Sequence, residues 1–95
     1  MIFAAVFDSA VKAFATPMVF PTVAAATRVF MIEVNRPDPG NLLNTNRADF
    51  DLYHVGDFNP DTGAVTAVTP VVVIHGRDVA PLAVPASGPV EGSGG

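Results

Sequence analysis

Residues 49–63 read Asp-Phe-Asp-Leu-Tyr-His-Val-Gly-Asp-Phe-Asn-Pro-Asp-Thr-Gly, so that alternating side chains lead directly into a cluster of turn residues. Alternation with a period of two is typical of a β-strand that buries one of its sides. We expect a buried side made of Phe50, Leu52, His54 and Phe58 and an outer side made of Asp51, Tyr53, Val55 and Asp57. The pattern predicts a sheet with one covered face.

Residues 59–63 have the composition of a hairpin turn. Asn59 can bond its own backbone, Pro60 fixes φ, and Gly63 can adopt a left-handed conformation. We therefore expect the chain to reverse here and to return as a partner strand over residues 64–68.

Two strands are predicted at the start of the chain. Residues 2–7 are short and apolar and end at Asp8, which is typical of a buried strand followed by a bend. Residues 11–20 are expected to form a second strand. Because Pro17 cannot donate a backbone hydrogen bond, this strand should lie at an edge or contain a bulge.

A helix is predicted over residues 23–35. Thr22 is a good N-cap, and Pro37 disfavours helical geometry in the residue before it. The apolar side chains that recur at helical spacing are Val23, Ala26, Phe30 and Val34, reinforced by Val29. This side of the helix is expected to pack on the sheet.

The remaining segments complete an α+β domain. Residues 41–48 are expected to form a surface loop, and the valine-rich residues 71–74 a buried strand or a dimer contact. We predict one domain over residues 1–80, with four to five mainly antiparallel strands in ββαββ order, and a flexible tail over residues 81–95. One helix covers one face of such a sheet, which favours a homodimer.

Composition restricts the classes of function. The 95 residues carry a formal net charge of −4, which argues against coating nucleic acid by phosphate neutralisation. Residues 1–47 nevertheless hold four of the five basic residues and three of the nine acidic ones. The absence of cysteine excludes disulfides and fits a reducing cytoplasm. We expect neither a membrane span nor a cleaved signal, since no apolar run is long enough and the N-terminus lacks basic residues.

No grouping of residues predicts catalysis, a metal or a cofactor. Asp57, Asn59 and Asp61 alternate like calcium ligands, but Val68 stands where the bidentate Glu is needed, so an ordinary turn is favoured. The two histidines in apolar strands are expected to be hydrogen-bonded structural residues. Ser9 lacks a nucleophile motif. We therefore predict a protein that is not an enzyme.

Aromatic residues offer a way to bind single-stranded nucleic acid by base stacking. Phe14, Phe20 and Tyr53 are candidate rings, although the first two are favoured as core and Tyr53 as an exposed or interface residue beside Asp51 and Asp57. The basic residues that we expect to contact DNA are Lys12, Arg28, Arg36 and Arg47.

The hairpin and several other segments resemble a known phage family. The hairpin contributes Asp49-Phe50, Leu52, Gly56, Phe58 and Gly63, and the other matching pieces are Phe7-Asp8-Ser9, Lys12, Ala13-Phe14, Pro17, Phe20, Ala26, Arg28, Phe30, Val34-Asn35, Pro37 and Thr69-Pro70. Over residues 2–76 the chain is similar to the small non-structural protein of gokushoviruses, single-stranded-DNA phages of the microvirus family. Members of that family are described as DNA-binding.

The resemblance implies a non-catalytic phage accessory protein in the host bacterial cytoplasm, acting in genome replication or packaging. The predicted partners are single-stranded DNA, a second copy of the chain, and a phage capsid or replication protein. The alternative is a self-associating interaction, scaffold or regulatory module that binds only protein, where affinity comes from apolar burial.

Overall fold

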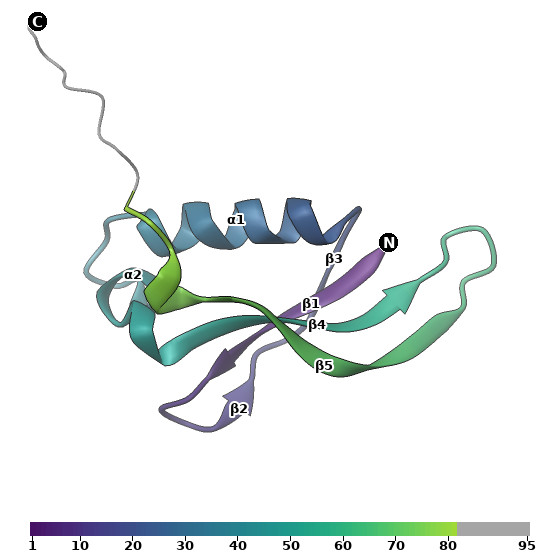
Figure 1. Ribbon diagram of the computed structural model, residues 1–95, viewed down its shortest axis with the longest axis horizontal. Helices are drawn as coiled ribbons and strands as arrows, with labels where there is room; N and C mark the ends of the chain where they lie inside the picture. Colours follow the sequence, from purple (N-terminus) through teal and green to yellow (C-terminus); the bar gives the residue numbers. More distant parts are fainter. Residues whose placement is uncertain (82–95) are drawn as a thin grey trace, which may run out of the picture.

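A computed structural model describes residues 1–81 of the protein (Figure 1). The strands are β1 (Ile2–Asp8), β2 (Ala13–Phe14), β3 (Met18–Phe20), β4 (Phe50–Phe58) and β5 (Val65–His75). The helices are α1 (Val23–Asn35) and the short α2 (Leu42–Thr45), with 3₁₀ turns η1 (Arg47–Asp49) and η2 (Gly76–Asp78). No helix in the described part of the chain is long and apolar enough to cross a membrane.

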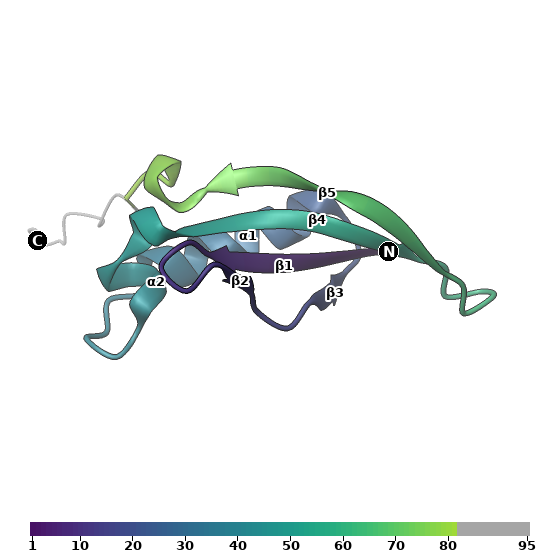
Figure 2. The same ribbon diagram turned by 90° about the horizontal axis from the view of Figure 1, so that it is seen from below.

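The strands form one antiparallel sheet in the order β2-β1-β4-β5, and β3 also pairs with β1 beyond the end of β2. Helix α1 lies along one side of this sheet (Figure 1), and the strands stand in front of it when the molecule is seen from below (Figure 2). The predicted α+β fold with one main helix on one face is confirmed.

The predicted hairpin forms, and its turn uses the expected residues. The side chain of Asn59 accepts from the backbone N–H of Asp61, and the N–H of Gly63 donates to the carbonyl oxygen of Asn59 at 2.7 Å. Gly63 has a φ of 75°, a conformation that glycine adopts without a steric penalty. This turn sets the pairing of β4 with β5.

Helix α1 has the bounds predicted from the sequence. The hydroxyl of Thr22 caps it by accepting from the N–H of Ala25 at 3.0 Å. Its buried side chains, Ala26, Phe30 and Val34, form the core with Ala4, Leu52 and Val79. The small side chains of Ala4 and Ala26 allow the helix to lie close to the sheet, and apolar burial holds it there.

Strand β4 has one extra residue at a bulge in its pairing with β1. Phe3 of β1 pairs with Gly56, whereas the next residue, Ala4, pairs with His54, so Val55 has no partner in β1. Such a bulge reverses which side chains point to each face of the sheet.

The bulge overturns part of the predicted facing of β4. Phe50 and Leu52 are buried on the helix side as expected. The prediction that Phe58 lies beside them is wrong, because its ring packs against Phe3 on the opposite side, with ring centroids 6.1 Å apart. Asp57 was expected on the outer side and lies on the helix side instead.

Three other segments differ from their predicted form. Residues 11–20 form two short strands instead of one, because Pro17 interrupts the ladder. Residues 41–48 contain α2 and the start of η1 where a loop was expected. The two predicted strands at 64–68 and 71–74 join in β5, which accommodates Pro70 through shifts of register against β4. The predicted tail falls outside the described residues from position 82 onward.

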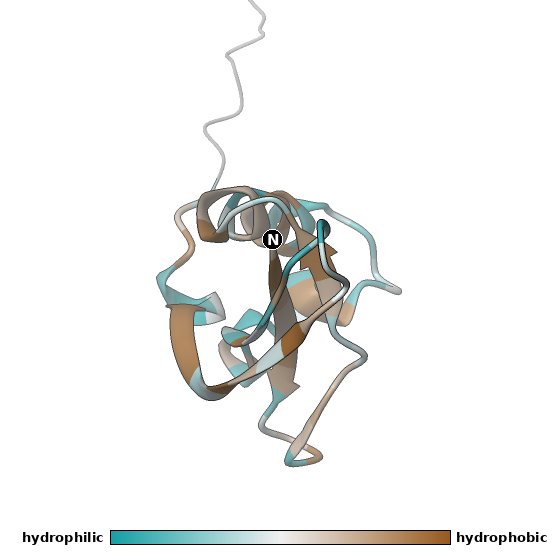
Figure 3. Ribbon diagram, turned by 90° about the vertical axis from the view of Figure 1, so that its right-hand side faces the viewer, coloured by the Kyte–Doolittle hydropathy of each residue, from teal (hydrophilic) through white to brown (hydrophobic). Residues whose placement is uncertain are grey.

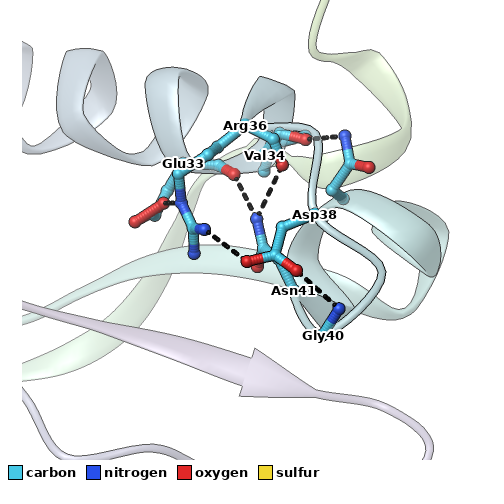
Figure 4. A network of polar contacts seen from close by, with 7 residues as sticks. Glu33, Val34, Arg36, Asp38, Gly40 and Asn41 are labelled. Carbon is cyan, nitrogen blue, oxygen red and sulfur yellow. Dashed lines mark hydrogen bonds and ion pairs between the residues drawn. The ribbon is translucent and has the colours of Figure 1, made fainter.

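The end of α1 is held by side-chain amides from the following segment (Figure 4). Asn41, which is buried, donates to the carbonyl oxygens of Glu33 and Arg36 at 2.9 and 3.1 Å. The amide of Asn44 donates to the carbonyl oxygen of Val34 at 2.9 Å. These bonds satisfy the carbonyl groups of Val34 and Arg36 and add a second donor to that of Glu33, which also accepts from the N–H of Arg36.

A short-range network of charges surrounds the same turn (Figure 4). The pKa of Asp38 lies below its ordinary value, first because the N–H of Gly40 donates to its carboxylate, and also because Arg36 lies 3.1 Å away. The pKa of Arg36 is raised, chiefly by its hydrogen bond and ion pair with Glu33. Arg36 is therefore neutralised locally by two acids.

Asp38→Asn should test this network through pH. Because folding depresses the pKa of Asp38, the stability that its charge contributes is present above the unfolded pKa, and it is lost as the pH falls below about 4. We expect the wild-type chain to have the higher melting temperature at pH 7 and the difference to shrink as the pH falls through the depressed pKa of Asp38. Thermal denaturation followed by circular dichroism measures it, and a pH-independent difference contradicts the assignment.

The corner where η2 meets η1 depends on a glycine. Gly76 is buried, and a Cβ there would lie 2.1 Å from the carbonyl oxygen of Arg47 and 2.5 Å from that of Phe50. No side chain fits at these distances unless the backbone moves.

Gly76→Ala should lower the free energy of unfolding by about 3 kcal/mol or more, because backbone atoms must separate. Gly40→Ala is the matched control, since its Cβ would lie 3.5 Å from the nearest atom, and it should change stability by less than about 1 kcal/mol. Urea denaturation compares the two, and equal effects contradict the close contact.

Candidate functional site

The side of the sheet opposite α1 is covered by no other element in residues 1–81 (Figure 2). We call it the open face, and its members follow from strand alternation and from cross-strand pairs, which point to the same side. They are Phe3, Ala5, Phe7, Phe14, Val19, Asp51, Tyr53, Gly56, Phe58, Val65, Ala67, Val72 and His75. Apolar residues along β1 and β5 stand out in the hydropathy colouring, against a polar hairpin turn (Figure 3).

Five aromatic rings stand on the open face in two groups. Phe7, Phe14 and Tyr53 form a triad in which ring centroids are 4.9 Å (Phe7 to Phe14), 5.2 Å (Phe14 to Tyr53) and 6.1 Å (Phe7 to Tyr53) apart. Phe3 and Phe58 form a separate edge-to-face pair. Phe14 is 45 % exposed, so the triad presents a ring to solvent.

The pair Asp51 and His75 contributes the acidic and imidazole side chains of this face. The imidazole Nδ1 of His75 lies 2.8 Å from a carboxylate oxygen of Asp51. The other histidine, His54, lies on the helix side, with its Nε2 2.9 Å from a carboxylate oxygen of Asp57. Both histidines are thus hydrogen-bonded strand residues, as predicted from the sequence.

A concave region lies on the helix side of the sheet. It is a cleft of about 370 Å³ between α1, β1 and the segment that joins β2 to β3. Its lining is apolar except for Thr16 and Glu33. In residues 1–81, no group of three or more His, Asp or Glu side chains is placed to hold a metal ion.

Two of the four predicted DNA-contacting residues make contacts within the protein. The guanidinium of Arg47 donates to the carbonyl oxygens of Val79 and Val34, at 3.1 and 3.4 Å, and to the side-chain oxygen of Asn35 at 3.2 Å. Arg36 is paired with Glu33 and Asp38, as described above. Their role in DNA binding stays a prediction, and their present contacts are structural.

Lys12 and Arg28 are exposed, but the fold does not bring them together. Lys12 lies in the turn between β1 and β2, with a φ of 58°, and Arg28 lies on α1. The turn and the helix are on different sides of the sheet (Figure 1). Of these two residues, Lys12 is the nearer in sequence to the aromatic triad, because it precedes Phe14 by two positions.

Arg47→Ala separates structure from ligand binding. Because it leaves the carbonyl group of Val79 without its donor and removes one of two donors to that of Val34, it should lower the free energy of unfolding by about 2 kcal/mol. Arg28→Ala should change it by less than about 0.5 kcal/mol, since Arg28 is exposed. Chemical denaturation measures both, and an equally small effect at Arg47 contradicts its structural role.

Sequence reasoning did not place Phe3, Phe7 and Phe58 on a binding surface. The signal lay in residues 2–7, where both alternating sets of side chains are apolar. A strand that is apolar on both sides normally lies in a sheet that is covered on both faces. The structure supplies one cover, α1, and leaves the other side open.

The comparisons with known proteins give a family. The model of the family described as Phage ORF5 protein matches residues 1–79, most of the chain and nearly all of its described part. The protein belongs to this phage family. The phage origin that the sequence resemblance implied is therefore confirmed. Searches of curated proteins and of solved structures gave no match.

Proposed function

We propose that this Phage ORF5 family protein is a non-catalytic accessory protein of the gokushovirus type, which binds single-stranded DNA on the open face during genome replication or packaging. Family membership supports the phage setting, and the resemblance of residues 2–76 supports the microvirus type. The host bacterial cytoplasm is the compartment in which that DNA is replicated.

The observation that carries this proposal is the set of aromatic rings on an uncovered antiparallel sheet. Single-stranded nucleic acids are held by stacking of unpaired bases on such rings, independently of base sequence. The exposed ring of Phe14 is held by two further rings, Phe7 and Tyr53. A base stacked on Phe14 would meet a platform that is already ordered.

The electrostatics determine the type of binding. Of the five basic residues, Lys12 stands nearest to Phe14 along the chain, and the open face itself carries Asp51 paired with His75. Such a surface neutralises about one phosphate, so binding energy must come from base stacking. The affinity should consequently depend little on salt, unlike that of a basic DNA-coating protein.

A module that binds only protein is the second candidate. The net charge of −4 and the apolar character of the open face favour it, since apolar burial between proteins needs no basic groups. A phage capsid or replication protein and a second copy of the chain are the partners of this class.

Titration of a fluorescein-labelled oligothymidine with the full chain tests the DNA proposal by anisotropy. We expect Phe14→Ala to weaken binding about tenfold, through the loss of one stacking ring. We expect the wild-type affinity to fall only about threefold between about 50 and 200 mM salt, as neutralisation of about one phosphate predicts.

Ile32→Ala is the matched control. Ile32 is 51 % exposed on α1, away from the open face, and its truncation should leave DNA affinity unchanged. Absence of binding at about 50 mM salt, or equal affinities for Phe14→Ala and the wild type, would refute binding on this face.

A further inference from the structure

We propose that, in the absence of DNA, a second copy of the chain covers the open face, sheet against sheet, so that dimerisation and DNA binding exclude one another. The part of this inference that concerns DNA rests on the proposed function. The dimer itself rests on the charge and the area of the face.

Charge favours a second copy as the occupant. In residues 1–81 the acidic and basic side chains of the open face are Asp51 and His75, and they lie 2.8 Å apart within one chain. The Asp51 carboxylate is thus hydrogen-bonded within its own chain and its side chain is only 18 % exposed, so contact with a second copy would bury few polar groups that lack a partner. A polyanion gains no comparable advantage from this face.

Area supports the same occupant. The 32 strand residues, each rising about 3.3 Å in strands about 4.8 Å apart, cover a face of roughly 510 Å². Two such faces in contact bury roughly 1,000 Å², which is about the least area that a specific interface needs. Packed sheets lie about 10 Å apart, so the rings of the two copies would interdigitate.

The modest area also explains how DNA could compete. An interface near the lower size limit is typically weak, and it dissociates readily. The triad that stacks on bases would lie inside this dimer interface. Mass action then makes the apparent affinity for DNA fall as the protein concentration rises.

Two neighbouring valines in β5 provide a test with its own control. Val72 pairs with Tyr53 on the open face, whereas Val71 pairs with His54 on the helix side. Val72 is 38 % exposed and Val71 56 % exposed, so both tolerate a long polar side chain. Val72→Lys and Val71→Lys add the same charge on opposite faces of the sheet.

Sedimentation velocity of the full chain over a concentration series measures the dimer. We expect the wild type and Val71→Lys to dimerise with similar constants and Val72→Lys to dimerise at least tenfold more weakly. Ala67→Lys, also on the open face opposite Gly56, repeats the test if Val72→Lys fails to fold. A wild type that is monomeric at every concentration, or a Val72→Lys chain that dimerises normally, overturns the inference.

Adding oligothymidine separates this inference from the proposed function. We expect it to convert wild-type dimers into DNA-bound monomers and Val72→Lys to bind it at least as tightly as the wild type. Oligothymidine bound to intact dimers overturns the exclusion. A dimer that Val72→Lys weakens in a chain that binds no oligothymidine refutes the DNA function and supports the dimer.

Discussion

The packing of α1 on β1 and β4 is the interaction on which the rest of the structure depends. Three helix side chains, Ala26, Phe30 and Val34, are buried against the sheet, and Val34 is completely inaccessible to solvent. A single helix of 13 residues can cover only one side of a five-stranded sheet. The aromatic open face is therefore a direct consequence of having one helix and strands that are apolar on both sides.

Local patterns in the sequence were sufficient for the elements, and contacts between distant segments were not predictable from them. The cap at Thr22 and Pro37 defined α1, and residues 59–63 defined the hairpin, because each acts on its own neighbours. The bulge at Val55 arises from pairing with β1, about fifty residues earlier. Alternation alone therefore assigned Phe58 to the wrong face.

For the candidate site too, local sequence features were predictable and contacts between distant residues were not. A count of charges identified four basic residues in the first half of the chain, but it could not show that Arg47 is used to hold the carbonyl groups of Val34 and Val79. Those partners lie 13 and 32 positions away in the sequence. What remains for a ligand is a set of rings with few charges, which suits bases or another apolar surface better than a phosphate backbone.

The unpaired Val55 has a consequence for how this family can vary. It lets β4 contribute Leu52 to the core and Phe58 to the opposite side within a single strand. Without Val55, Gly56 would follow His54 directly, so the ladder with β1 would become regular and Phe58 would stay on the side opposite α1. The side that Phe58 occupies is thus fixed by pairing with β1, and the bulge absorbs the extra residue. Relatives that lack this residue can present the same aromatic surface with strictly alternating sequences.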